Sequence, residues 1–232
     1  MDSPHVEPSG PRFSPLRDRQ SAGAQLATAL ASYAKDHPVV LAIPPGGVPV
    51  AAEIAHRLGG ELNIIVAQPI TAPGNEAVIL GAVTASGESA LNDEAIAGLG
   101  VSEAFVQRAI AQSRADAQRR EEQIRGALRP PVVRDRTVII VDDGVATAAP
   151  LLAAVRAVRQ FHPARVVVAV PVGEPKACRH LEGVADDVLT LVQPAPFHRV
   201  ADHYQRFDRL TDADAAALVR EHAHPRSGNP TA

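Results

Sequence analysis

Residues 137–150 read TVIIVDDGVATAAP, and this stretch decides the fold. The first five residues are all β-branched, a composition that favours a strand buried on both faces. Two aspartates and a loop of small residues follow, and Pro150 stands at a favoured first position of the helix that we predict over 151–160. The stretch therefore predicts a strand, a tight loop and a helix in succession.

The same alternation continues along the chain in both directions. Short apolar runs predict further strands at 39–43, 62–67, 165–170 and 187–192. Segments of helical period predict helices at 21–36, 48–58 and 174–182. Apolar strands separated by helices are typical of a parallel sheet with helices on both faces, so we predict an α/β fold.

Three segments break this alternation. Residues 1–15 and 222–232 are rich in Pro, Ser and Gly, and we predict that both are disordered tails around a domain at 16–221. Residues 71–131 hold Gly- and Asn-rich turns, a short apolar run at 78–83 and a long charged helix at 102–125 with a thin apolar stripe. We interpret them as an insertion beside the sheet.

The composition limits the functional classes. The chain has 232 residues, 46% of them apolar, and a net charge of -3, as is typical of a soluble globular protein. Its single cysteine excludes an intramolecular disulfide and a Cys-based zinc site, which favours the cytoplasm. No apolar run is long enough to span a membrane, and no basic block suggests nucleic acid. Small molecules or protein partners remain.

The paired acids Asp142 and Asp143 are the strongest candidates for chemistry. Ligands of open parallel sheets bind at the carboxyl ends of strands, where helix N-termini offer free N–H groups to a phosphate. Adjacent carboxylates suit ribose hydroxyls or a divalent cation. The alternative is that the two acids only cap the turn.

This stretch resembles the 5-phosphoribosyl-1-diphosphate (PRPP) signature of type I phosphoribosyltransferases, which is an apolar strand, two acids, a short loop and T-G-x-T. Residues 43–51, IPPGGVPVA, resemble the pyrophosphate loop of a predicted bacterial branch of that family. Other segments follow the order of the family: Arg17-Asp18-Arg19, Gly23, residues 72–75, 81–83 and 194–197, Tyr204 and Phe207. The resemblance implies a parallel-sheet fold with a small C-terminal hood around 194–210.

The resemblance also implies roles for individual residues. Asp142 and Asp143 would hold the ribose hydroxyls of PRPP and, indirectly, a Mg²⁺ ion that bridges the diphosphate. Gly46 and Gly47 would let the backbone approach the diphosphate. The insertion would cover the site. The 5-phosphate would be cradled by the loop residues Gly144, Val145, Ala146, Thr147, Ala148 and Ala149, and the base could stack on Phe197, Tyr204 or Phe207, although core packing explains these aromatic residues equally well.

Several positions depart from the pattern of the family. Pro45 replaces an arginine, Ala67-Gln68 replaces Arg-Lys, and Ala148 and Pro150 replace Gly and Thr of T-G-x-T. These changes remove cationic groups, a hydroxyl and an N–H that would bind phosphate, and Ala148 restricts a backbone that glycine would leave free. We therefore keep three hypotheses. The first is a glycosyltransferase of nucleotide metabolism that moves a 5-phosphoribosyl group to or from a base or amine. The second is a non-catalytic paralogue that acts as a binding or regulatory module, and the third is an interaction protein that forms a homodimer through its Arg-rich helix.

Overall fold

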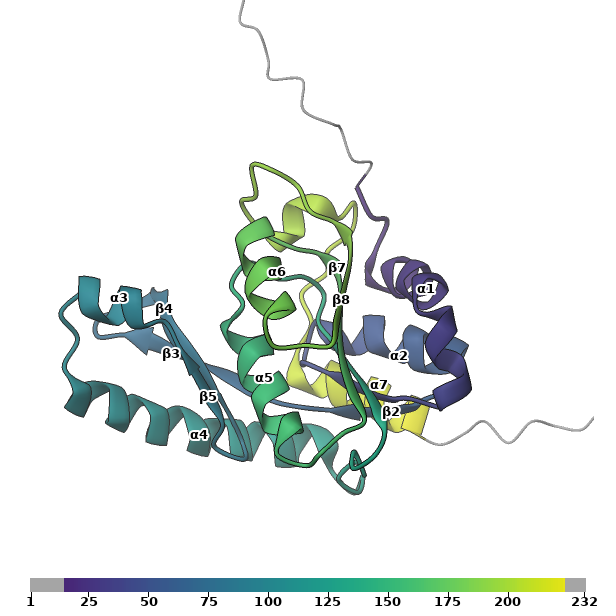
Figure 1. Ribbon diagram of the computed structural model, residues 1–232, viewed down its shortest axis with the longest axis horizontal. Helices are drawn as coiled ribbons and strands as arrows, with labels where there is room; N and C mark the ends of the chain where they lie inside the picture. The colour runs from purple at the N-terminus through teal and green to yellow at the C-terminus, as the bar shows by residue number, and fades with distance from the viewer. Residues whose placement is uncertain (1–14, 224–232) are drawn as a thin grey trace, which may run out of the picture.

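The structure is a computed structural model that describes residues 15–223 (Figure 1). The tails predicted at 1–15 and 222–232 lie outside the described residues except for Pro15, His222 and Ala223. The last two belong to helix α7 (Asp212–Ala223), so the prediction began the C-terminal tail two residues too early. Within the described range, no helix is both long and apolar enough to cross a membrane.

Five parallel strands form the central sheet, which confirms the predicted fold class. The spatial order of the strands is β2-β1-β6-β7-β8, and each neighbouring pair is parallel. Their bounds are β1 (Val39–Ala42), β2 (Glu61–Ile64), β6 (Thr137–Val141), β7 (Arg165–Val172) and β8 (Asp187–Val192).

Helices cover both faces of this sheet. Alternate side chains of β1 point to opposite sides, because Val40 and Ala42 join one core cluster and Val39 and Leu41 join the other. The first cluster lies under α1 (Arg19–Ala29), α2 (Gly47–Leu58) and α7. The second lies under α5 (Ala149–Arg159) and α6 (Pro175–Glu182). The core therefore has two apolar layers separated by the sheet.

A second, antiparallel sheet projects from the parallel one, at the left of Figure 1. Its strands are β3 (Ala67–Ala72), β4 (Asn75–Thr84) and β5 (Ser89–Leu91), and α3 (Asp93–Gly98) and α4 (Glu103–Arg125) follow them. Ile70 and Leu80 pack toward α3 and α4, whereas Ala82 and Ala90 pack on Ala153 of α5. One face of this unit therefore packs on α5 of the central domain, and α4 also contributes Ala117 and Ile124 to the first core cluster.

Two predicted elements are divided in the structure. The strand predicted at 62–67 ends at Ile64, because Ala67 already pairs with Thr84 in the second sheet. The helix predicted at 21–36 ends at Ala29 and continues as the short 3₁₀ helix η1 (Ala31–Asp36). The chain then turns through His37, whose φ of 43° lies in the left-handed region, and enters β1.

Candidate functional site

The carboxyl ends of β1 and β6 form the crevice in which open parallel sheets bind ligands. From β1 the chain passes through α2 to β2 on one side, and from β6 it passes through α5 to β7 on the other. The loops after β1 and β6 therefore diverge at a topological switch point. The two segments that sequence analysis singled out, 43–51 and 142–149, make up these loops and the first residues of α2 and α5.

Gly46 and Gly47 allow the two loops to pack against each other. A Cβ atom built on Gly46 would overlap the carboxylate of Asp143, and one on Gly47 would lie 2.6 Å from the main-chain oxygen of Val141. The space beside these glycines is thus filled by the β6 strand and its acidic loop. Loop packing explains both glycines by itself, and their predicted contact with a diphosphate stays a prediction.

The acid pair directly follows β6 at this switch point. The Nε atom of Arg19, at the start of α1, lies 2.8 Å from Oδ2 of Asp143, and the two side chains are only 10% and 15% exposed. The main-chain N–H of Asp143 donates to Oδ1 of Asp142 at 2.8 Å. Burial and the charge of Asp143 raise the pKa of Asp142 well above its ordinary value. Burial also raises the pKa of Asp143, although Arg19 opposes this rise.

The loop after the acid pair offers free main-chain donors. Val145 is fixed between Val172 and Glu174 by hydrogen bonds of 2.9 and 2.8 Å. In the part of the chain that the structure describes, the N–H groups of residues 146–149 donate to no protein acceptor. They stand at the N-terminus of α5, where the helix dipole favours an anion. Ala148 has ordinary helical dihedral angles (φ −73°, ψ −15°), so this loop conformation does not require a glycine there.

Of the other residues predicted to hold the phosphate, one packs against neighbouring side chains and two are exposed to solvent. Gly144 faces Val200 and Val172, which leave no room for a side chain. Ala146 and Thr147 are exposed, so the hydroxyl of Thr147 is free to approach a ligand.

The predicted aromatic residues of the hood already have partners. Tyr204 is 7% exposed, and its hydroxyl donates to the main-chain oxygen of Asp143 at 2.6 Å. The ring of Phe207 lies 3.7 Å from the Arg19 guanidinium carbon, and the ring of Phe197 stacks on His203 with centroids 5.4 Å apart. Core packing and cation–π contact therefore account for these rings.

Gln68, at a position where the family carries a cation, is tied to a structural ion pair. Its Oε1 accepts from Nη1 of Arg120 at 2.8 Å, and Arg120 also binds both carboxylate oxygens of Asp212 at 2.9 and 2.8 Å. The positive charge beside Gln68 is thus already neutralised by a carboxylate. Ala67 is buried, and Pro45 is half-buried.

Arg19 is the site residue that sequence reasoning missed. Its segment, Arg17-Asp18-Arg19, matched the order of the family, but its pairing with an acid 124 residues away has no local signal. Asp18 beside it was more predictable, because Asp18 and Ser21 form a capping box at the N-terminus of α1.

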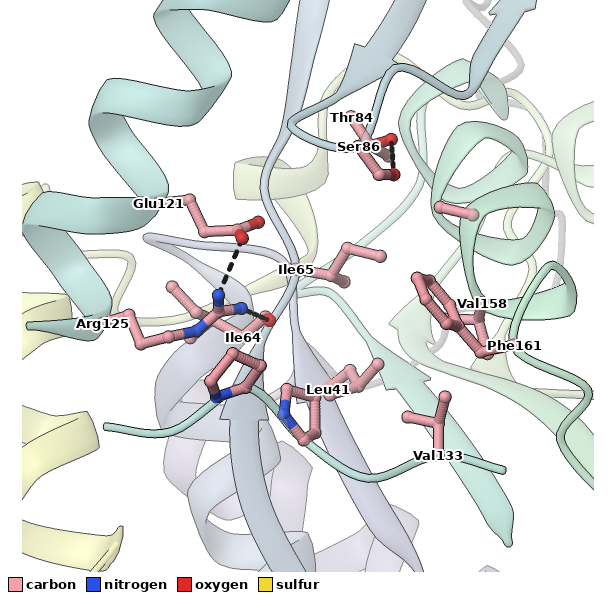
Figure 2. A pocket seen from close by; sticks show the side chains of 13 residues that line it. Leu41, Ile64, Ile65, Thr84, Ser86, Glu121, Arg125, Val133, Val158 and Phe161 are labelled. Atoms are coloured by element: carbon pink, nitrogen blue, oxygen red, sulfur yellow. Dashed lines mark hydrogen bonds and ion pairs between the residues drawn. The ribbon is translucent and has the colours of Figure 1, made fainter. Parts of the chain in front are cut away.

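The hollow in Figure 2 lies elsewhere and holds none of the predicted site residues. It has a volume of about 140 Å³. Arg125 pairs with Glu121 at 2.8 Å and donates to the main-chain oxygen of Ile64 at 3.1 Å, while the hydroxyls of Thr84 and Ser86 bond to each other. Since these polar groups satisfy one another, we assign no ligand to this hollow.

The described residues do not form a complete metal centre by themselves. Between residues 15 and 223, no group of three or more His, Cys, Asp or Glu side chains could hold a metal ion. Two adjacent carboxylates are only part of the six oxygen ligands that Mg²⁺ requires. Any Mg²⁺ in this crevice would need further oxygen ligands from a bound molecule or from water.

Comparison with known proteins gives consistent matches. A family model described as the phosphoribosyl transferase domain matches residues 18–202. Proteins of Mycobacterium tuberculosis strains CDC 1551 / Oshkosh and H37Rv, each named "putative phosphoribosyl transferase", are 36% identical to this chain over 208 residues. These alignments cover 89% of this chain and 46% of each relative, so the chain spans about half the length of the curated relatives it matches. This chain is also similar to the crystal structure of TT1426 from Thermus thermophilus, with 41% sequence identity and a TM-score of 0.76. The structural alignment covers 90% of this chain and 100% of that one.

Proposed function

This chain belongs to the phosphoribosyl transferase family, and we propose that it binds PRPP or a nucleoside 5-monophosphate and transfers the 5-phosphoribosyl group to or from a base or amine. One observation carries the proposal: the acid pair and the donor-rich loop at the N-terminus of α5 lie in succession at the switch point of the parallel sheet. This crevice offers carboxylates for hydroxyl groups and N–H groups for a phosphate.

The proposed chemistry depends on positioning. In the forward direction the bond from C1 of the ribose to the diphosphate oxygen breaks, and a bond from C1 to a nitrogen of the acceptor forms. Diphosphate leaves, and the proton lost by that nitrogen passes to the diphosphate or to water. Positive charge develops on the ribose in an oxocarbenium-like state, which the buried carboxylates of the site would stabilise. The N–H groups of residues 146–149, with the Thr147 hydroxyl, would hold the 5-phosphate.

We include Mg²⁺ in the proposal as a partner of the diphosphate. The acid pair suits a hard cation that also binds ligand oxygens and water. When bound, the ion would neutralise charge on the diphosphate. The remaining roles fall to the protein: orienting the ribose, holding the 5-phosphate and excluding water.

The cysteine content supports a cellular compartment for this activity. A single buried cysteine, Cys178, fits a reducing compartment. We accordingly assign the activity to nucleotide metabolism in the cytoplasm, with a small-molecule phosphoribosyl substrate.

A non-catalytic binding module is the second candidate. Two observations favour it: the cation beside Gln68 is neutralised by Asp212, and Pro150 removes one N–H group from the first turn of α5. Such a protein would keep affinity for a phosphorylated ligand after losing turnover.

Calorimetry tests the binding step. We expect the wild-type protein to bind PRPP with Mg²⁺ or a nucleoside 5-monophosphate at millimolar concentration or below, and Asp142→Asn to abolish this binding. Asp116→Asn is the matched control, because Asp116 pairs with Arg119 and Gln112 on the surface of α4. Absence of binding by the wild type would contradict the proposal.

Turnover separates the two candidates. The wild-type protein is incubated with PRPP, Mg²⁺ and a panel of bases and amines, and released diphosphate is measured. Release that disappears in Asp142→Asn supports the transferase. Binding without release by the wild type supports the binding module.

A further inference from the structure

The side chain of Asp143 is enclosed by protein on two sides. The Arg19 guanidinium contacts Oδ2. Gly46 lies so close to the same carboxylate that a Cβ atom at this position would overlap it. With 15% of its side chain exposed, Asp143 has little surface left for a ligand. Its position is therefore fixed before any ligand binds.

Arg19 connects this acid to the hood. While Nε contacts Asp143, Nη1 donates to the main-chain oxygen of Asp208 at 2.8 Å, and the guanidinium lies 3.7 Å from the ring centroid of Phe207. From the other side, Tyr204 donates its hydroxyl to the main-chain oxygen of Asp143. Two side chains thus join the start of α1, the β6 loop and the segment 204–208.

Asp142 lies beside this pair, but among residues 15–223 it makes no ion pair or hydrogen bond with Arg19. Among residues 15–223, its carboxylate accepts one hydrogen bond, from the N–H of Asp143 to Oδ1. It has no cationic partner there comparable to Arg19. The carboxyl group of Asp142 therefore keeps hydrogen-bonding capacity for a ligand hydroxyl.

We infer that the paired acids have different roles: Asp143 forms a positioning pair with Arg19 that fixes the segment 204–208 over the crevice, and Asp142 is the acid that contacts the ligand. The second half rests on the proposed function, whereas the first half rests only on contacts within the chain. Arg19 is then a positioning residue that acts through Asp143 and the hood.

Hydrogen exchange measured by mass spectrometry tests the positioning pair. The reporters are the amides of residues 204–206, which donate to Ala201, Leu16 and Arg17. We expect Arg19→Met and Asp143→Asn each to make exchange there roughly 10- to 100-fold faster, the ratio that corresponds to a lost hydrogen bond to a charged group. The double variant should exchange no faster than the more affected single one, because both substitutions remove one interaction.

Two variants control for general destabilisation. Tyr33→Phe removes a hydrogen bond to Asp187 at the opposite end of the strands, so exchange at 204–206 should not change. Arg19→Lys keeps the charge and should restore part of the protection, and it is the variant to use if Arg19→Met does not fold. Unchanged exchange at 204–206 in Arg19→Met and Asp143→Asn, or additive effects in the double variant, would overturn the positioning pair.

Ligand binding tests the assignment of Asp142. Calorimetry of the wild-type protein with PRPP and Mg²⁺ tests the proposed function independently of the positioning pair. We expect Asp142→Asn to abolish binding while exchange at 204–206 stays at the wild-type rate, and Arg19→Lys to bind more tightly than Arg19→Met. If Asp143→Asn abolishes binding without changing exchange, the two acids share one role and the inference is wrong. If the wild type does not bind, the proposed function and the ligand role of Asp142 fail together, and the exchange data still decide the positioning pair.

Discussion

At the scale of the residue, the site depends on close contacts between segments that are distant in the sequence. Gly46 is the clearest case, because the carboxylate of Asp143 occupies the space that a side chain would need. The glycine pair was predictable from the motif at 43–51, but its structural reason was not, since Asp143 follows a different strand. Arg19 was missed for the same reason.

The first prediction concerns Gly46→Ala. The added methyl group should displace the Asp143 carboxylate and weaken its ion pair with Arg19, which we expect to lower the free energy of unfolding by about 1–3 kcal/mol. Urea denaturation measures this change. Gly98→Ala is the matched control, because a Cβ there meets nothing within 4 Å, and it should leave stability unchanged or raise it slightly. Equal effects of the two substitutions would contradict the packing argument.

The second prediction concerns Asp18 and pH. The pKa of Asp18 is lowered from 3.8, first by the main-chain N–H of Ser21 and further by Arg206 and Arg17. A carboxylate with a lowered folded-state pKa stabilises the protein above its unfolded pKa, and this contribution is lost as the pH falls through the folded-state value. Asp18→Asn keeps the capping geometry without the charge.

We therefore expect Asp18→Asn to be less stable than the wild type by about 1 kcal/mol at pH 7, and we expect this difference to shrink as the pH falls below 3.8 and through the lowered folded-state pKa of Asp18. Denaturant titrations at several pH values measure it. A difference that does not change as the pH falls below 3.8 would show that the charge of Asp18 does not contribute.

At the scale of the element, periodicity predicted the central strands and covering helices well. The predicted limits of β6 and β8 coincide with the observed ones. In β6 they are marked by an unbroken β-branched run that is buried throughout. The single strand predicted at 62–67 was wrong, because this apolar run passes from β2 of the parallel sheet into β3 of the antiparallel sheet. No local feature of the sequence marks that change of sheet.

The third prediction concerns the connection of α4 to α7 and β3. Arg120 binds Asp212 with two hydrogen bonds and Gln68 with a third, and its side chain is only 27% exposed. We expect Arg120→Ala to lower the free energy of unfolding by about 1–3 kcal/mol, because it leaves these partners unsatisfied. Arg119→Ala, next along the helix, removes only an exposed pair and should cost less than about 1 kcal/mol. Thermal denaturation compares the two, and a larger loss for Arg119→Ala would refute the argument.

At the scale of the whole molecule, the parallel sheet and the projecting antiparallel sheet differ in burial. The residues of β6 are buried throughout, and Val138 to Val141 are 0% exposed. In β4, the first three residues are exposed. Stability should therefore be unevenly distributed between the two sheets.

The fourth prediction follows from this difference. Hydrogen exchange should be slowest at the amides of β1, β6 and β7, and faster at residues 71–79, where the β3–β4 pairing is irregular and more exposed. Native-state exchange of the wild-type protein measures both sets. Comparable protection of residues 71–79 and β6 would mean that the projecting sheet unfolds only with the whole domain.

The two tyrosines have a practical consequence for such experiments. The chain contains no tryptophan, and the phenol of Tyr33 binds Asp187, the first residue of β8, whereas that of Tyr204 binds Asp143 just beyond the end of β6. The intrinsic near-ultraviolet emission of the protein therefore arises from two fluorophores at opposite ends of one sheet. Replacing either with phenylalanine leaves a label-free optical probe of the other end.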